Sequence, residues 1–210
     1  MYPARYFQEQ GIERVLSLVH QSPLASILFS HPQTKLNDVV YSPLIFDASK
    51  HLFIGHVAKN NPLVQQNNSK VKLLFNGPND YISPSHRADL VVPTWLYANV
   101  QIEGRLELVT EHELKLKMMT QITNHFERES RKPWLVSSLE TTKLNALFDH
   151  IVFFTISLDQ WCGSFKLSQN KPPKVKAQIM QSLKTRGNKA LSELVGSYID
   201  NDITDGNVPN

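Results

Sequence analysis

The segment from Asn99 to Val109 carries the clearest periodicity in this chain, because apolar and polar side chains alternate along it. Side chains two residues apart share a face of an extended strand, so the segment predicts a strand with one buried and one solvated face. Such strands are typical of antiparallel sheets. Gly104 interrupts the apolar face, which indicates a bend or the close approach of another backbone. The apolar positions are Val100, Ile102, Leu106 and Leu108, and the polar positions are Gln101, Glu103, Arg105 and Glu107.

Other apolar runs predict further strands, and four-residue periodicity predicts helices. Pro43 cannot donate a hydrogen bond to a sheet, so it indicates an edge, a bulge or a break. Thr110 with Glu113, and Ser137 with Glu140, have the spacing of capping boxes. The expected strands cover residues 24–29, 39–46, 51–54, 71–75, 81–83, 99–109 and 151–158, with a tight turn at 76–80. The expected helices cover residues 9–20, 110–130, 137–147 and two segments after residue 175, separated by Gly187. Because regular βαβ alternation is missing, we expect an α+β fold whose antiparallel sheet curls into a small barrel.

The length of 210 residues suits one medium domain with a small appendage. We expect a barrel domain over residues 1–165, a basic loop with C-terminal helices packed on it over residues 166–199, and a flexible tail over residues 200–210. Cys162 is the single cysteine, which excludes an intrachain disulfide and favours a cytoplasmic location. The chain begins without an apolar signal region, and no run of about 18 apolar residues predicts a membrane span.

Positive charge is concentrated in one segment, although the net charge of the chain is only +3. No acidic residue lies between Asp159 and Glu193. The segment is either a solvated helix face or a surface for phosphate, of a nucleotide cofactor or of DNA. Its basic residues are Lys166, Lys171, Lys174, Lys176, Lys184, Arg186 and Lys189.

The stretch G-H-V-A-K-N-N-P at residues 55–62 joins an apolar run to a predicted helix start. Asn61 is expected to cap the helix, with Pro62 at its first position, which would leave backbone N–H groups free for an anion. Lys59 adds a positive charge. The same residues also form ordinary strand-to-helix turns, and for this motif alone the ordinary turn is the favoured interpretation.

Other candidate residues have simpler interpretations. The eight histidines include no metal-binding motif, and His56 is more often satisfied by backbone groups than catalytic. Ser85, His86 and Asp89 suggest a hydrolase triad, but the chain has no G-x-S-x-G nucleophile elbow, so loop polarity explains them better. Trp95 is either a core residue or the wall of a site for a flat heterocycle.

Four blocks of sequence resemble the PaiB-type FMN-binding negative transcriptional regulator family. They are G-H-V-A-K-N-N-P at 55–62, F-N-G-P followed by Y-I-S-P-S at 75–85, V-P-T-W at 92–95 and K-L-S-Q-N-K at 166–171. The blocks occur in the order of the family, and the similarity extends from the first residues to about Leu183.

The resemblance implies a split β-barrel of the flavin-reductase and pyridoxamine-phosphate-oxidase type, working as a homodimer with FMN at the subunit interface. It also implies a role in repressing gene expression, and haem is the alternative cofactor. At positions that match the family, the cofactor site would comprise Gly55, His56, Lys59, Asn60 and Pro62 around the phosphate, Trp95 near the ring, and Lys166, Ser168 and Gln169 as a second set reaching across the dimer.

The chain departs from the family pattern at several of these blocks. Lys59 replaces an arginine, which keeps the charge but loses the bidentate fork. Residues 63–66, beginning with Leu63, lack the family's tryptophan and arginine, and residues 85–87 replace S-W-Y. Leu96 and Gln101 replace an asparagine and a histidine. Each lost donor whose partner stays buried would cost about 1–3 kcal/mol of affinity.

Three hypotheses remain open from the sequence. The first, which we favour, is an FMN-binding split-barrel protein with a regulatory or redox-linked role, in which any catalysis would be that of a flavin-dependent oxidoreductase. The second is a DNA-binding repressor acting through the basic C-terminal segment. The third is a degenerate barrel that no longer binds flavin and serves as an interaction module.

Overall fold

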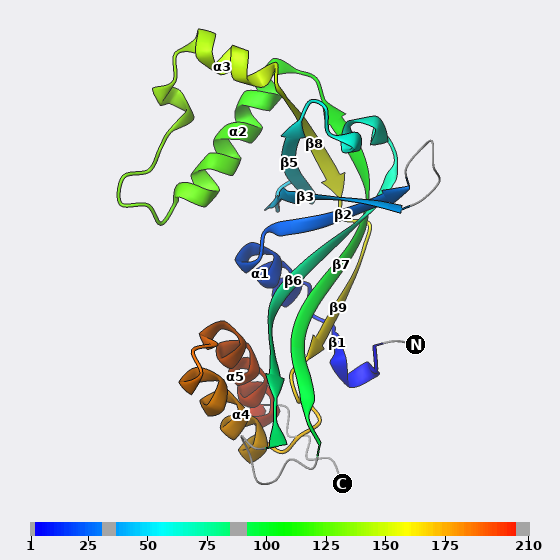
Figure 1. The fold of residues 1–210 in the computed structure, drawn as a ribbon, viewed down its shortest axis with the longest axis vertical. Helices are drawn as coiled ribbons and strands as arrows, with labels where there is room; N and C mark the ends of the chain where they lie inside the picture. The colour runs from blue at the N-terminus through cyan, green and yellow to red at the C-terminus, as the bar shows by residue number, and fades with distance from the viewer. Residues whose placement is uncertain (1–2, 31–36, 85–91, 205–210) are drawn as a thin grey trace. The chain divides into compact units, whose positions relative to one another are not determined.

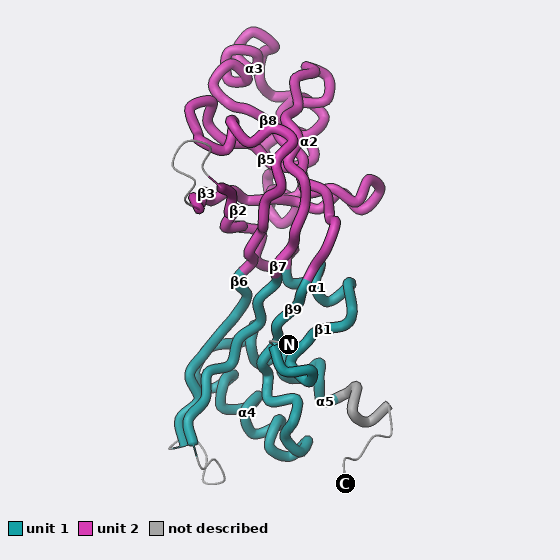
Figure 2. The backbone as a smooth tube through the Cα atoms, turned by 90° about the vertical axis from the view of Figure 1, so that its right-hand side faces the viewer, with its two compact units in different colours: residues 1–18, 76–100, 162–210 teal, residues 19–75, 101–161 magenta. Residues whose placement is uncertain are grey.

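The computed structural model describes residues 3–30, 37–84 and 92–204. Its contacts divide the chain into two compact units, shown in different colours in Figure 2. Unit 1 comprises Met1–Leu18, Asn76–Val100 and Cys162–Asn210, and unit 2 comprises Val19–Phe75 and Gln101–Trp161. Each unit therefore combines segments that are far apart in the sequence.

The strands form an antiparallel sheet with the order β3-β2-β6-β7-β8-β5-β4, and β9 pairs with β1 and β7 (Figure 1). Every pair whose register is defined is antiparallel. The sheet is not closed, which agrees with the expected split barrel and confirms the α+β prediction. The strands are β1 (Gln8–Glu9), β2 (Leu24–Ser30), β3 (Asn37–Pro43), β4 (Ile45–Asp47), β5 (Leu52–Ala58), β6 (Lys70–Ile82), β7 (Thr94–Val109), β8 (Ile151–Ser157) and β9 (Gln160–Lys166).

In unit 2, α2 (His112–Glu127) and α3 (Thr141–Phe148) cover β4, β5 and β8. Short 3₁₀ helices at Pro62–Gln66 and Val136–Ser138 accompany them. The apolar stripe of α2 packs against the sheet because its four-residue spacing puts Met118 and Ile122 on one face. The buried members of this core are Ile45, Ile54, Met118, Ile122, Val136, Leu144, Phe148 and Phe153.

Unit 1 contains a 3₁₀ helix at Arg5–Phe7, most of α1 (Ile12–Gln21) and a hairpin of α4 (Pro173–Thr185) and α5 (Lys189–Thr204). The predicted cap at Gly187 is confirmed, since its φ of 87° lies in the left-handed region that glycine adopts without strain. The fully buried side chains of the hairpin are Ile179, Leu183, Leu191 and Val195, together with Lys176.

Two predictions about strand interruptions are confirmed. The chain leaves the sheet after Pro43, and β4 begins at Ile45. At Gly104 a Cβ atom would overlap the carbonyl oxygen of Ser157, so glycine permits the close approach of β7 and β8.

The predicted tight turn at residues 76–80 is wrong, because β6 continues through them to Ile82. A Cβ atom at Gly77 would lie 2.7 Å from the carbonyl oxygen of Ala98 and 2.7 Å from Leu18 Cδ1. The glycine therefore serves packing against a neighbouring strand, and sheet pairing overrides the turn propensity of the segment.

Three other local predictions also need correction. Strand β9 occupies Gln160–Lys166, a segment for which no strand was predicted. The N-caps of α2 and α3 are Glu111 and Glu140, and neither makes a side-chain capping hydrogen bond, so the predicted capping boxes do not form. Residue Thr204 ends α5 inside the segment predicted as a tail.

Candidate functional site

The stretch at residues 55–62 ends β5 and turns into the 3₁₀ helix of unit 2. Gly55 is buried opposite Phe154 of β8. A Cβ atom at Gly55 would lie 2.5 Å from Leu44 Cδ2 and 3.0 Å from Phe154 Cζ, so the glycine is required by packing. Lys59 and Asn60 are exposed in the turn that follows.

His56 is half-buried on β5 beside Phe153, with ring centroids 5.5 Å apart. Burial lowers the pKa of His56 below its ordinary value of 6.5. The imidazole is therefore neutral at pH 7, where it can both donate and accept a hydrogen bond but carries no charge for a phosphate.

The predicted cap at Asn61 is confirmed, since its Oδ1 accepts a hydrogen bond of 2.9 Å from the backbone N–H of Leu63. The prediction that backbone N–H groups at this turn are free to bind an anion is wrong. Lys59 donates its N–H to the carbonyl of His150, Asn61 donates to Ala58, and Val64 donates to Asn61. A 3₁₀ helix of five residues also has a small dipole. Attraction of an anion to this turn therefore depends on the exposed ammonium of Lys59.

Trp95 lies on β7 in unit 1 with 52% of its side chain exposed, so it is not a core residue. Its Nε1 donates a 3.2 Å hydrogen bond to Asn79 Oδ1, and the exposed ring of Tyr81 lies 6.1 Å away between centroids. The sequence did not point to Asn79 and Tyr81, because Asn79 was assigned to a turn and the strand predicted at 81–83 was not paired with the strand that carries Trp95. The aromatic pair offers a surface on which a flat ring could stack.

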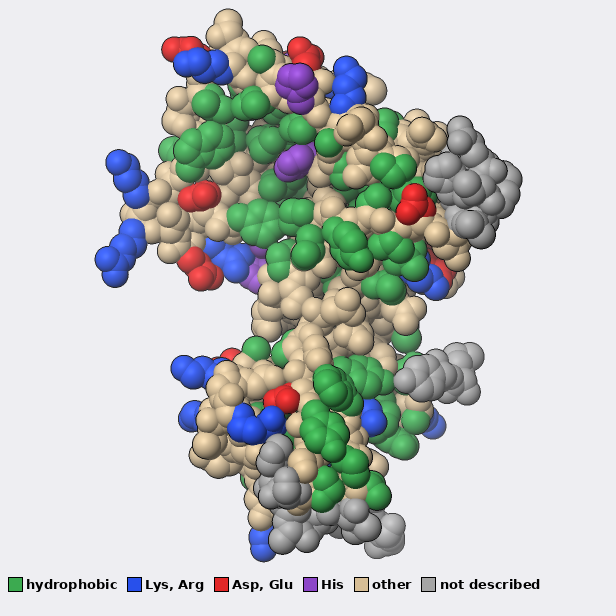
Figure 3. Space-filling model, in the orientation of Figure 1, with side chains coloured by type: hydrophobic (Ala, Val, Ile, Leu, Met, Phe, Trp, Pro, Cys, Tyr) green, Lys and Arg blue, Asp and Glu red, His purple; other side chains and the backbone are tan. Residues whose placement is uncertain are grey.

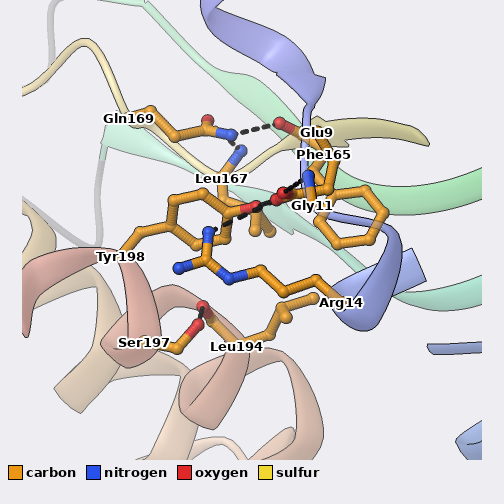
Figure 4. Close-up of polar contacts among 9 residues, drawn as sticks. All are labelled: Glu9, Gly11, Arg14, Phe165, Leu167, Gln169, Leu194, Ser197 and Tyr198. Carbon is orange, nitrogen blue, oxygen red and sulfur yellow. Dashed lines mark hydrogen bonds and ion pairs between the residues drawn. The ribbon is translucent and has the colours of Figure 1, made fainter. Parts of the chain in front are cut away.

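Lys166 is the last residue of β9, and Ser168 and Gln169 lie in the turn that follows it in unit 1. Gln169 Oε1 accepts a 2.8 Å hydrogen bond from the N–H of Leu167, and Gln169 Nε2 donates to the carbonyl of Phe165 (Figure 4). Ser168 is buried with a φ of 64°. The amide of Gln169 therefore holds this turn in its left-handed conformation, and Lys166 is the half-buried cation beside it.

The expected site residues thus fall into separate groups. Residues 55–62 run from the end of β5 into a turn and a 3₁₀ helix of unit 2, whereas Trp95 and residues 166–169 belong to unit 1. The triad candidates Ser85, His86 and Asp89 lie outside the described residues. Among the residues that the structure describes, no group of three His, Cys, Asp or Glu side chains could hold a metal ion.

The basic segment is not a continuous charged surface. Lys176 is fully buried, and its Nζ donates a 3.3 Å hydrogen bond to the carbonyl of Tyr198. Arg186 Nη1 lies 3.0 Å from Asp80 Oδ2. Both residues stabilise unit 1. The exposed lysines of the basic segment are therefore Lys171, Lys174, Lys184 and Lys189.

Unit 2 also has an open cavity of about 440 Å³. Lys72 and Glu103 meet at 3.0 Å on its wall, and the outward-facing Lys70 lies two residues away on the same strand. No sequence pattern points to this cavity, because its lining comes from five strands that are distant in the sequence. The polar lining residues are Ser30, Asn37, Lys70, Lys72, Glu103, Asp159 and Gln160.

Comparison with known proteins gives consistent matches. The profile of the family described as "Putative FMN-binding domain" matches residues 1–160. The protease synthase and sporulation protein PAI 2 of Bacillus subtilis is 26% identical over 202 residues, covering 93% of this chain and 96% of that protein. The uncharacterized protein AN0679 of Emericella nidulans is 26% identical, with 80% of this chain and 84% of that protein covered.

Solved structures with a similar fold include two flavoproteins. The FAD and heme binding protein of Mycobacterium smegmatis has a TM-score of 0.60 at 13% identity, covering 76% of this chain and 73% of that chain. The flavocytochrome Anf3 of Azotobacter vinelandii has a TM-score of 0.57 at 11% identity, covering 77% of this chain and 71% of that chain. At these identities the similarity demonstrates the fold, which is the expected split barrel.

Proposed function

The chain belongs to the FMN-binding domain family, and from this we propose that it binds FMN as a homodimer and has a regulatory or redox-linked role of the PaiB type. The observation that carries the proposal is the match of the family profile over residues 1–160, which includes three of the four sequence blocks. The relative from B. subtilis supports the regulatory part, since it matches nearly the full length of both proteins. We place the protein in the cytoplasm. Within the described part of the chain, no helix has the length and apolarity needed to cross a membrane.

The chemistry of the residues fits a flavin mononucleotide. In unit 2, Lys59 is an exposed cation suited to a phosphate, and in unit 1, Trp95 and Tyr81 are exposed aromatic side chains suited to stacking on a flat ring. His56 is neutral and adds a hydrogen-bonding group next to the turn. A bound flavin would supply electron transfer, while the protein positions it and controls access of water. Gln169 would not contact the cofactor in this proposal. Its amide instead stabilises the turn that follows Lys166.

The homodimer has support from an apolar face of the sheet in unit 2. Leu24 and Tyr41 are 59% and 67% exposed, and Val39 is 41% exposed. The register of β2 with β3 sets Leu24 opposite Pro43 and Leu28 opposite Val39, so these side chains share one face. Apolar side chains reach the surface within both units (Figure 3). A second copy of the chain would remove this apolar face from water.

The test of cofactor binding is a visible spectrum and a fluorescence titration of the purified protein with FMN. We expect bound flavin with a dissociation constant below tens of micromolar. A Soret band in place of flavin bands would identify haem as the cofactor, and the absence of both would leave the degenerate barrel as the better hypothesis.

The phosphate contact is tested by Lys59→Gln against Lys50→Gln, which removes an equal charge from another exposed turn. We expect Lys59→Gln to weaken FMN binding about tenfold, which corresponds to the loss of one charged hydrogen bond. Riboflavin has no phosphate, so its binding should stay unchanged. Equal effects of the two variants would contradict the assignment. Light scattering of the wild type and of Tyr41→Glu tests the dimer, which the substitution should dissociate.

The alternative of direct DNA binding has less support, because two of the basic residues are used inside unit 1. Lys174→Glu with Lys184→Glu is the suitable test, since both lysines are exposed. Loss of salt-dependent binding to promoter DNA in this variant would favour the repressor hypothesis.

A further inference from the structure

Three basic side chains converge where α1 and α2 end, and none of them belongs to the proposed flavin site. His20 lies in the last turn of α1, His125 lies in the last turn of α2, and Arg128 follows α2 directly. All three belong to unit 2. The two imidazole rings are 4.8 Å apart between centroids and nearly perpendicular, at 77°. They border a cavity of about 220 Å³, whose other described lining residues are Gln21, Pro23, Phe126 and Glu129.

Arg128 faces both imidazoles through the same nitrogen. Its Nη1 lies 2.5 Å from His20 Nε2 and 3.3 Å from His125 Nε2. A guanidinium only donates hydrogen bonds, so both Nε2 atoms act as acceptors. An imidazole that accepts at Nε2 carries its proton on Nδ1. When either ring takes up a second proton, its Nε2–H becomes a donor and faces another donor with no acceptor between them.

The charges around the cavity define what could satisfy these donors. Glu129 is the one acidic residue among the described residues of the lining, and its Oε1 lies 3.5 Å from Arg128 Nε. With neutral histidines this carboxylate balances the guanidinium. With both histidines protonated, three cations face one carboxylate that is 85% exposed and two helix C-termini of about half a negative charge each. About one positive charge is then left, and three sets of N–H donors point into one space.

We propose that this cleft is a binding site for a tetrahedral oxyanion, phosphate or sulfate, which Arg128 and the protonated imidazoles of His20 and His125 hold together. Such an anion has enough acceptor atoms for the guanidinium fork and for both Nε2–H groups. The cavity of about 220 Å³ is large enough for such an anion, because one water molecule occupies only about 30 Å³ in the liquid. The site is independent of the proposed flavin site and goes beyond it.

The proposal makes anion binding depend on pH. Burial, followed by the charges of His20 and Arg128, lowers the pKa of His125 below its ordinary value of 6.5. A bound anion favours the protonated imidazole and therefore raises this pKa. By linkage, the anion binds more tightly as the pH falls and His125 becomes protonated.

The wild-type protein provides the first test, by NMR of the histidine ring protons during titration with sodium sulfate at pH 5.5 and pH 8. Sulfate keeps the same charge at both values, so any difference belongs to the protein. We expect saturable shifts of the His20 and His125 signals at pH 5.5, binding at least tenfold weaker at pH 8, and a higher pKa of His125 in sulfate than in sodium chloride of equal ionic strength. The absence of saturation at 50 mM sulfate would overturn the proposal.

Matched variants provide the second test. Arg128→Gln is compared with Arg131→Gln, which removes an equal charge from an exposed position three residues further on. We expect Arg128→Gln to weaken sulfate binding at least tenfold and Arg131→Gln to change it less than twofold. Arg128 is 41% exposed, and melting temperatures check that both variants stay folded. Equal effects would overturn the site, and so would a parallel loss of FMN affinity in Arg128→Gln, because the cleft would then hold the flavin phosphate.

Discussion

The hydroxyl of Tyr198 on α5 donates a hydrogen bond to Oε2 of Glu9, a carboxylate that is 95% buried on β1 (Figure 4). The second oxygen of Glu9 accepts a 2.7 Å hydrogen bond from the N–H of Gly11. Arg14 lies 3.4 Å from the carboxylate and also stacks over the ring of Tyr198, 4.5 Å from its centroid. A buried negative charge in unit 1 is thus satisfied by a phenol, a backbone amide and a guanidinium.

Tyr198→Phe removes one partner of this buried carboxylate while keeping the ring under Arg14. We expect it to lower the free energy of unfolding by about 1–3 kcal/mol, the cost of leaving a buried acceptor incompletely paired. Urea unfolding measures the change. Tyr41→Phe is the control, because Tyr41 is 67% exposed, and a loss of equal size there would contradict the explanation.

Lys176 and Lys174 lie two residues apart on α4 and differ in burial, since only Lys176 is fully buried. We expect Lys176→Glu to destabilise the protein by about 3 kcal/mol or more, because it places an unpaired negative charge in the interior. Lys174→Glu should change stability by less than about 0.5 kcal/mol. Thermal unfolding of both variants decides this, and similar melting temperatures would contradict the burial of Lys176.

Gly104→Ala should be destabilising by about 3 kcal/mol, because its Cβ would overlap the carbonyl of Ser157 and force β7 and β8 apart. Gly187→Ala is the comparison. Nothing lies within 4 Å of a Cβ there, so its cost of about 1 kcal/mol comes from the positive φ alone. Denaturant unfolding should give Gly104→Ala a clearly lower free energy of unfolding than Gly187→Ala. The reverse order would show that β7 and β8 can separate freely.

The stability of the protein should fall as the pH decreases from 7 to 5. Burial holds the pKa of His56 below its ordinary 6.5, so the unfolded chain takes up a proton before the folded protein does. The contribution of neutral His56 to the free energy of unfolding is complete above pH 6.5 and is lost as the pH falls towards the pKa of His56 in the folded protein. His125 acts in the same direction. His56→Gln should therefore flatten the dependence of unfolding free energy on pH in part, and an unchanged slope would contradict this role of His56.

Sequence patterns predicted the parts of the fold that depend on neighbouring residues. The alternation from Asn99 to Val109 lies within β7, and Pro43 and Gly187 end their elements as expected. The turn predicted at residues 76–80 was wrong because its composition favours a turn, whereas pairing along β6 decides the outcome.

The candidate site was predictable to a similar extent. The motif at residues 55–62 identified a capped turn, but not that partners distant in sequence, such as His150, use its N–H groups. The convergence of His20 with His125 joins two helix ends that no local pattern connects. Contacts of this kind depend on the path of the whole chain, which spacing alone does not reveal.

The bond between Glu9 and Tyr198 has a consequence for the order of events during synthesis. Glu9 and Tyr198 are separated by 189 residues, so the carboxylate stays without its phenol until α5 has also left the ribosome. All segments of unit 2 are synthesised once Trp161 is reached, before α4 and α5 of unit 1. Unit 2 can therefore fold while unit 1 is still incomplete. A ribosome that stalls after Trp161 would therefore expose a nascent chain in which unit 2 is complete and the Glu9 carboxylate still lacks its partner from α5.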